Sequence, residues 1–212
     1  MNEKTKINFE NCPLILFKIN DSTSAAVLDL SQLLDLEKKS RFNELNPLAS
    51  SFLLQKLLNT KEEMWINHEK SGRPILQNNS YFISKSHSHN MIAIALNKEK
   101  RIGCDIELIR EKIVRVREKF LNKNEIHLIP KNNIETNILA WSIKESLLKA
   151  NGNKSFQFKE KITISEICVE NEKEFRSKAI LEEETKKICS LNSWKIENYI
   201  FTCLNSIHSE DQ

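Results

Sequence analysis

The sequence predicts an α+β fold, because stretches typical of helices and stretches typical of antiparallel strands occur in two successive groups. The apolar run at residues 13–19 suits a buried strand. Residues 24–39 carry apolar side chains at helical spacing, which predicts a helix. A second helix is expected from Pro47 to Leu58, because Asn46 can cap it and proline is favoured at the first helical position.

A turn signal at residues 71–74 separates these helices from a stretch rich in strand-forming residues. Three strands are expected there, at residues 81–83, 91–96 and 102–108. Two helices and three strands follow, at residues 120–129, 136–150, 161–169, 174–181 and 194–204. We therefore expect an N-terminal lobe (1–100), a C-terminal lobe (101–204) and a loose polar tail (205–212).

Composition and charge narrow the class of protein. Hydrophobic residues make up 40% of the 212 residues and charged residues 29%, as in ordinary globular proteins. The net charge of +3 permits an acidic partner or a phosphate-rich ligand, but it is too small for the dense basic face of a nucleic-acid binder. Aromatic residues, at 7%, are too few for a base-stacking platform. We expect no nucleic-acid partner.

Cysteine usage and the N-terminal sequence indicate the compartment. The five cysteines form no C-x-x-C pair and are odd in number, which is typical of small buried side chains in a reducing compartment. The N-terminus lacks the apolar segment of a secretory signal, and the apolar run at residues 14–17 is too short to span a membrane. We expect a cytoplasmic protein without a membrane partner.

The segment at residues 102–108 carries two acidic side chains on one side of an expected strand. Alternation places Asp105 and Glu107 on one face and the apolar residues on the other. Gly103 lies on the acidic face and would leave room for a ligand. Two neighbouring carboxylates repel each other, and oxygen ligands alone favour magnesium, calcium or manganese over zinc. The alternative is an ordinary exposed polar face.

The expected helix that ends at Gly152 carries a polar stripe on a half-buried surface. Trp141, Glu145 and Lys149 follow i, i+4, i+8 spacing, and leucine and isoleucine occupy the opposite side. A carboxylate there needs a partner, because burying an unpaired charge is costly. Lys149 could form a routine ion pair with Glu145. Alternatively, Glu145 is a third metal ligand and Lys149 contacts a phosphate.

A third polar segment, at residues 84–89, precedes a buried strand. His87 and His89 alternate, as in some zinc sites, but no cysteine or acidic residue nearby completes a zinc ligand set. An imidazole beside serine hydroxyls suits a phosphate better. The alternative is an ordinary surface turn.

These segments occur in a familiar order. The motifs are G-R-P at 72–74, S-x-S-H-S at 84–88, I-G-C-D-I-E at 102–107 and W-S-I-K-E-S-L-L-K at 141–149. Together they resemble the 4'-phosphopantetheinyl transferase superfamily, in particular its long, two-lobed surfactin-synthetase type. The resemblance implies two similar lobes, each a small, mostly antiparallel sheet packed with helices, about a pseudo-twofold axis. It also implies a monomer with the ligand between the lobes.

The resemblance implies roles for the second lobe. Asp105, Glu107 and Glu145 would hold Mg²⁺, which would bridge the pyrophosphate of coenzyme A. Lys149 would contact the departing phosphate, and Lys144 would lie beside the pocket.

It also implies a nucleotide end and a base. Arg73, Ser86 and His87 match positions near the 3'-phosphate. Phe120 and Glu125 resemble another family segment, whose acid helps to position or deprotonate the attacking serine together with the acid matched by Glu145. Ser84 stands where family members commonly have Asn. The basic residues of the first lobe that contact the nucleotide are unassigned, and the candidates are Lys38, Lys39, Arg41 and Lys56.

The implied reaction is the attack of a carrier-protein serine on the β-phosphorus of coenzyme A, which expels 3',5'-ADP. The carrier would be acidic, and a basic run could dock it: Arg110, Lys112, Arg115, Arg117 and Lys119. The alternative for this run is a solvated charged segment. Two alternatives remain for the protein: a metal-dependent phosphohydrolase, and a non-catalytic homologue that binds coenzyme A or a carrier.

Overall fold

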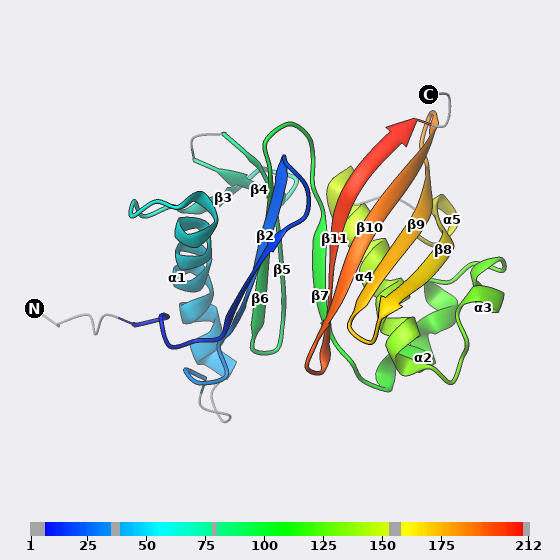
Figure 1. The fold of residues 1–212 in the computed structure, drawn as a ribbon, viewed down its shortest axis with the longest axis horizontal. Coiled ribbons are helices and arrows are strands. Elements are labelled where there is room, and N and C mark those ends of the chain that lie inside the picture. The colour runs from blue at the N-terminus through cyan, green and yellow to red at the C-terminus, as the bar shows by residue number, and fades with distance from the viewer. Residues whose placement is uncertain (1–6, 35–38, 78–79, 153–157, 210–212) are drawn as a thin grey trace, which may run out of the picture.

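The computed structural model of this protein describes residues 7–34, 39–77, 80–152 and 158–209. Two antiparallel sheets stand side by side, each with helices against it (Figure 1). The first sheet has the order β1-β2-β6-β5, with β1 (Leu14–Lys18), β2 (Thr23–Asp29), β5 (Phe82–Ser88) and β6 (Met91–Asn97). The second has the order β7-β11-β10-β9-β8, with β7 (Cys104–Leu108), β8 (Ile162–Asn171), β9 (Glu174–Glu182), β10 (Lys186–Ile196) and β11 (Tyr199–Ser209).

The remaining elements cover or connect these sheets. A small hairpin is formed by β3 (Ile66–His68) and β4 (Pro74–Leu76). The helices are α1 (Lys39–Leu58), α2 (Lys112–Val116), η1 (Arg117–Lys119), α3 (Glu125–Leu128), α4 (Ile134–Asn151) and α5 (Phe158–Lys161). The expected α+β class is therefore confirmed, whereas the pseudo-twofold relationship and the lobe boundaries stay predictions. No helix among the described residues is long and apolar enough to cross a membrane.

The first sheet is buried on both of its faces at its centre. Ala26 and Leu28 of β2 pack toward α1, whereas Ala25 and Val27 belong to the core that includes the second sheet and α4. This explains why residues 24–34 do not form the expected helix, while residues 35–38 of that prediction lie outside the described residues. A strand buried on both faces reads as a continuous apolar run, and such a run can mimic helical spacing.

The first helix begins earlier than its sequence signals indicate. Pro47 lies inside α1 rather than at its start. An internal proline removes one backbone hydrogen bond. Burial of Leu45, Ala49 and Leu53 in the core of the first lobe offsets this loss.

The C-terminal region contains one more strand than expected. Residues 194–204 are not a single strand, because β10 ends at Ile196 and β11 begins at Tyr199. Glu197, in the turn between them, has a φ of 51°. The expected loose tail is also wrong for residues 205–209, which continue β11, and residues 210–212 lie outside the described residues.

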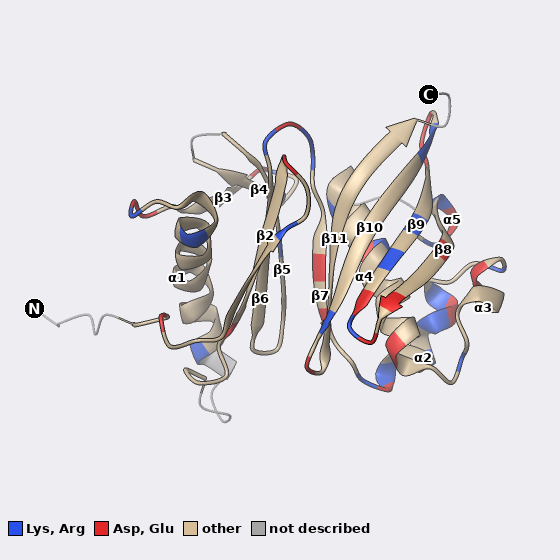
Figure 2. Ribbon diagram, viewed as in Figure 1, with Lys and Arg blue, Asp and Glu red and all other residues tan. Residues whose placement is uncertain are grey.

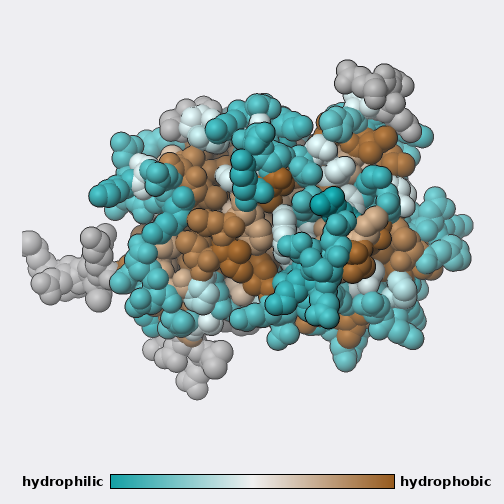
Figure 3. All heavy atoms as spheres, viewed as in Figure 1, coloured by the Kyte–Doolittle hydropathy of each residue, from teal (hydrophilic) through white to brown (hydrophobic). Residues whose placement is uncertain are grey.

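Some apolar surface of the first lobe stays exposed. Hydrophobic residues gather over the first sheet on the face in Figure 3. The strand β1 at the edge of that sheet leaves Ile15 39% and Leu16 56% exposed. The opposite edge strand, β5, lies beside β7, the edge strand of the second sheet. The candidate site forms at this junction.

Candidate active site between the two sheets

Helix α4 lies directly against the acidic face of β7. A Cβ atom on Gly103 would lie 1.8 Å from the carbonyl oxygen of Ser146, so only glycine permits this approach. The expectation that Gly103 leaves room for a ligand is therefore wrong, because α4 fills the space. The close approach places Trp141 and Lys149 within hydrogen-bonding distance of the acids of β7.

Asp105 is the most deeply buried of the three acids. It is only 2% exposed, and its Oδ1 accepts hydrogen bonds from Ser86 Oγ at 2.8 Å and from Lys149 Nζ at 2.7 Å. Its Oδ2 is buried without a hydrogen-bond partner. Burial lowers the pKa of Lys149, but its contacts with Asp105 outweigh this effect and raise the pKa overall. The site thus contains a bound cationic side chain and an unpaired anionic oxygen.

Two further carboxylates stand beside Asp105. Glu107 accepts hydrogen bonds from Trp141 Nε1 at 3.0 Å and from Ser88 Oγ at 3.3 Å. Burial raises the pKa of Glu107, and repulsion by Asp105 raises it further. Burial, followed by the same repulsion, raises the pKa of Glu145 to about 7. The three neighbouring carboxylates therefore repel one another, and a bound cation would reduce this repulsion.

The chemistry of these donors fits a hard divalent cation. All three side chains offer carboxylate oxygens, and Asp105 Oδ2 is an unsatisfied one. Among the described residues, however, no group of three or more His, Cys, Asp and Glu side chains is placed so that it could hold a metal ion. The shared coordination of Mg²⁺ by Asp105, Glu107 and Glu145 therefore stays a prediction.

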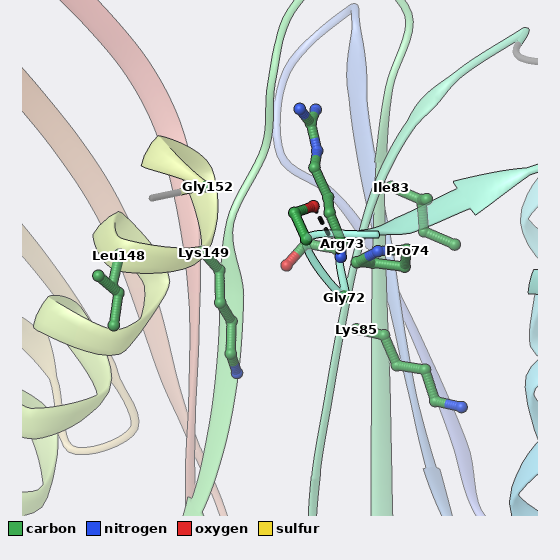
Figure 4. A pocket seen from close by; sticks show the side chains of 10 residues that line it. Gly72, Arg73, Pro74, Ile83, Lys85, Leu148, Lys149 and Gly152 are labelled. Carbon is green, nitrogen blue, oxygen red and sulfur yellow. Dashed lines mark hydrogen bonds between the residues drawn. The ribbon is translucent and has the colours of Figure 1, made fainter. Parts of the chain in front are cut away.

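A basic pocket of about 230 Å³ opens beside Lys149. We call it the basic pocket; its lining is Ser71, Gly72, Arg73, Pro74, Ile83, Ser84, Lys85, Leu148, Lys149 and Gly152. Figure 4 shows Lys149 extending from α4 on one side and Arg73 on the other, whereas the Lys85 side chain points away from both, and its ammonium bonds to Asn46 of α1. Burial and then the nearby Arg101 lower the pKa of Arg73. The two cations Lys149 and Arg73 at one pocket suit an anionic ligand such as a phosphate.

Successive polar side chains of β5 point to opposite sides of the strand, toward β7 or toward α1. Ser86 faces β7, whereas the His87 ring lies 5.2 Å from the ring of Phe42 on α1. Lys85 donates to Asn46, also on α1, and burial lowers the pKa of Lys85 to about 8. The matched residues Ser86 and His87 therefore serve different parts of the site.

The two histidines of this segment do not share one face. His87 belongs to β5, but His89 lies in the turn before β6 with a φ of 53°. The strand alternation on which the expected His-x-His pair depended therefore ends before His89. Burial, followed by repulsion from Lys85 and Lys149, lowers the pKa of His87.

Glu125 and Lys144 form a buried ion pair away from this junction. Their side chains are both 0% exposed, and Lys144 Nζ lies 2.8 Å from Glu125 Oε2. Glu125 also accepts the backbone N–H groups of Asn122 and Ile164, and Lys144 donates to the Ile162 carbonyl. This burial does not favour the catalytic role expected for Glu125 or the coenzyme-binding role expected for Lys144, and both roles stay predictions. The pair ties α4 to α3 and β8.

The basic run after β7 is only partly available to a partner. Arg117 is 6% exposed and donates to Asn137 Oδ1 at 3.1 Å and to the Ile129 carbonyl at 2.6 Å, so it is corrected from a docking residue to a structural one. The exposed members are Arg110, Lys112, Arg115 and Lys119. Figure 2 shows basic and acidic residues mixed on and around α2, which follows β7 in the chain.

A second pocket of about 180 Å³ links that basic surface to the acids. We call it the α2 pocket; its lining is Glu107, Arg110, Lys112, Ile113, Val116, Ile138 and Trp141. Glu107 therefore borders this opening, and Lys149, which pairs with Asp105, borders the basic pocket.

Sequence reasoning missed some contacts of the site. The hydroxyl groups of Ser84 and Ser88 on β5 accept hydrogen bonds from backbone N–H groups of β7. The alternating serines at residues 84–88 were the sequence signal that could have indicated these contacts. Of the first-lobe candidates for the nucleotide, Lys56 instead pairs with Glu10 at 3.0 Å, and Lys38 lies outside the described residues.

Comparison with known proteins identifies the family. Residues 101–204 match the family model described as the 4'-phosphopantetheinyl transferase superfamily. These residues, just under half of the chain, belong to that superfamily. The match to the superfamily includes Asp105, Glu107, Glu145 and Lys149, and the resemblance inferred from the motifs is confirmed at this level.

One curated relative supports the same membership. The chain is 30% identical over 109 residues to "4'-phosphopantetheinyl transferase gsp" of Aneurinibacillus migulanus. The matched region covers 50% of this chain and 45% of the relative, so the chain spans about half the length of that superfamily member. The narrower surfactin-synthetase type stays a prediction.

Proposed function

We propose that this protein transfers the 4'-phosphopantetheine arm of coenzyme A to a serine of an acyl or peptidyl carrier protein, with release of 3',5'-ADP and dependence on Mg²⁺. The observation that carries the proposal is the meeting of Ser86, Lys149 and Asp105, which come from three elements and leave one Asp105 oxygen unpaired. Membership of the superfamily and the basic pocket beside Lys149 support it.

The nucleotide end of coenzyme A is assigned to the basic pocket. Arg73 and Lys149 give this pocket positive charge, and Lys85 also lines it, although its ammonium bonds to Asn46. Phosphates bind well where several cationic donors converge. We assign the pyrophosphate to Lys149 and the 3'-phosphate to the side of Arg73, Lys85 and His87.

The metal is assigned to the three acids. Asp105, Glu107 and Glu145 would hold Mg²⁺, which supplies positive charge to the pyrophosphate oxygens when it is bound. Lys149 adds a protein charge at the departing phosphate, where transfer to phosphorus requires neutralisation. In the structure this lysine neutralises Asp105 instead. Coenzyme A therefore offers Lys149 a second anionic partner.

The proton of the attacking serine needs an acceptor. Glu145 offers a carboxylate beside the proposed reacting groups, which is the kind of group that a general base requires. Glu125 is less suited to this role, because it is fully buried and both of its oxygens already accept hydrogen bonds. We therefore assign this role to Glu145 alone.

The carrier is assigned to the α2 side. The α2 pocket runs from the acids to Arg110 and Lys112 on the surface. Arg115 and Lys119 extend this exposed basic surface. Complementary charge would speed the encounter with an acidic carrier.

Mass spectrometry of apo-carrier proteins tests the proposal. We expect one carrier of a panel to gain one phosphopantetheine after incubation with the enzyme, coenzyme A and Mg²⁺, with 3',5'-ADP in equal amount. Cleavage of coenzyme A at the same rate without a carrier would indicate a phosphohydrolase. Binding of coenzyme A without turnover on any carrier would indicate a non-catalytic homologue.

A further inference from the structure

Serine hydroxyls, rather than a direct backbone ladder, connect β5 to β7. Ser84 Oγ accepts the Cys104 N–H at 3.0 Å, and Ser88 Oγ accepts the Leu108 N–H at 3.2 Å. Both bonds join residues 20 positions apart, so the two edge strands run side by side in the same direction. These hydroxyls satisfy edge N–H groups of β7 from the neighbouring lobe.

Two of the alternating serines also bond to the proposed metal ligands. Ser86 Oγ donates to Asp105 Oδ1 at 2.8 Å and accepts from Lys149 Nζ at 2.9 Å. Ser88 Oγ donates to Glu107 Oε2 at 3.3 Å. A hydroxyl has one proton. The Ser86 proton is directed to Asp105, whereas the Ser88 proton can go to Glu107 or to His89 Nδ1, which lies 3.4 Å away.

These bonds restrict how the carboxylates can turn. Ser86 and Lys149 hold Oδ1 of Asp105, which leaves Oδ2 as the oxygen without a partner. Glu107 is held at one oxygen by Ser88 and at the other by Trp141. Ser86 and Ser88 are each 7% exposed, so water competes little for these bonds. Hydrogen bonds of this kind orient metal ligands and tune the affinity for the metal.

We propose that Ser86 and Ser88 are positioning residues through which the first lobe fixes the orientation of Asp105 and Glu107. This inference rests on the proposed function, because it assigns the serines to the same metal site. It gives Ser86 a task other than direct contact with coenzyme A. It also makes the cation affinity of second-lobe residues depend on hydroxyls of the first lobe.

Ser84 provides a matched control. It lies on the same side of β5, is buried, and accepts a β7 N–H as Ser88 does, but its hydroxyl bonds to no carboxylate in the described part of the chain. Replacement of Ser84 by alanine removes a connection between the strands without removing a donor to an acid. A purely structural role for the serines predicts equal effects at positions 84, 86 and 88.

The test is a titration of Mn²⁺ into the purified full chain, with free Mn²⁺ followed by electron paramagnetic resonance. Mn²⁺ is used as a probe because it shares the oxygen-ligand preference of Mg²⁺. We expect Ser86→Ala to weaken Mn²⁺ binding by about tenfold, the lower end of the usual effect of residues that support metal ligands. Ser88→Ala should weaken it less, because its bond is longer. Ser86→Thr, which keeps a hydroxyl, should restore binding.

The control and folding checks make the result decisive. Ser84→Ala should bind Mn²⁺ as the wild type does, even if its unfolding temperature falls. Ser86→Cys keeps the volume but donates weakly, and it replaces the alanine variant if that variant does not fold. Wild-type affinity in Ser86→Ala or Ser86→Cys, or an equal loss in Ser84→Ala, would overturn the inference. If the wild type binds no Mn²⁺, the metal assignment in the proposed function is contradicted together with this inference. If the wild type binds Mn²⁺ and Ser86→Ala binds it equally well, only this inference fails.

Discussion

Lys149 Nζ lies 2.7 Å from Asp105 Oδ1 and joins helix α4 to strand β7 in a largely buried ion pair. The Asp105 side chain is only 3% exposed, whereas Lys149 is 29% exposed and borders the basic pocket. The lysine therefore links a buried acid to a pocket open to solvent. In the proposed reaction it is the protein charge that an incoming phosphate meets first.

Removal of this lysine should affect stability and transfer differently. Lys149→Met leaves Asp105 buried without its cation, and breaking a buried pair costs about 3–5 kcal/mol. The double variant Lys149→Met with Asp105→Asn should regain much of this stability but not the transfer rate, which we expect to fall about 10²–10³-fold in both. Urea unfolding and the carrier assay measure the two effects. Full activity in the stable double variant would exclude the assigned roles.

Glu145 should make the metal-free protein less stable as pH rises. Its folded pKa of about 7 lies above the ordinary value of 4.5, so the folded state binds more protons than the unfolded state between these values. The contribution of Glu145 to stability is therefore present below pH 4.5 and is lost as pH rises through about 7. Glu145→Gln should unfold at a higher temperature than the wild type at pH 8, by about 2–4 °C for each kcal/mol gained. A lower unfolding temperature at pH 8 would contradict the raised pKa.

The Glu125–Lys144 pair should contribute to stability rather than to catalysis. Glu125→Gln or Lys144→Met breaks a fully buried pair and should cost about 3–5 kcal/mol. The fraction that remains folded should keep its transfer rate within about tenfold of the wild type, because neither residue borders the pockets or the acids. Rates are compared per folded molecule at low temperature. A several-hundredfold loss of the transfer rate without a loss of stability would indicate a catalytic role for Glu125.

Two arginines of the basic run should behave in opposite ways. Arg115 is exposed, so Arg115→Glu should raise the KM for an acidic carrier and leave the KM for coenzyme A unchanged. Arg117→Glu should instead destabilise the protein, because Arg117 is buried and bonded to Asn137 and Ile129. Steady-state kinetics and thermal unfolding separate the two. Unchanged carrier kinetics for Arg115→Glu would dismiss the docking surface.

Local patterns predicted the elements that form the site. Alternation in residues 102–108 indicated β7 with its paired acids, and the i, i+4 stripe with Gly152 indicated α4 and its end. The order of motifs also indicated the superfamily that residues 101–204 confirm. Such signals are contained within a few neighbouring residues, which is why a single sequence reveals them.

Tertiary contacts decided what the local patterns could not. Arg117 and Arg115 look alike in the sequence, but only Arg117 meets Asn137 and the Ile129 carbonyl. Glu125 resembles a family acid, but its burial against Lys144 does not favour contact with the reacting groups. Gly103 appeared to make space for a ligand, whereas the structure uses it for the approach of α4. Each difference depends on residues distant in the chain.

A crystal structure with coenzyme A and Mn²⁺, with the metal located by anomalous scattering, tests the metal site most directly. We expect one Mn²⁺ coordinated by carboxylate oxygens of Asp105, Glu107 and Glu145 and by the pyrophosphate, with Lys149 against the departing phosphate. A metal held elsewhere, or Glu145 directed away from the two acids of β7, would contradict the proposed site.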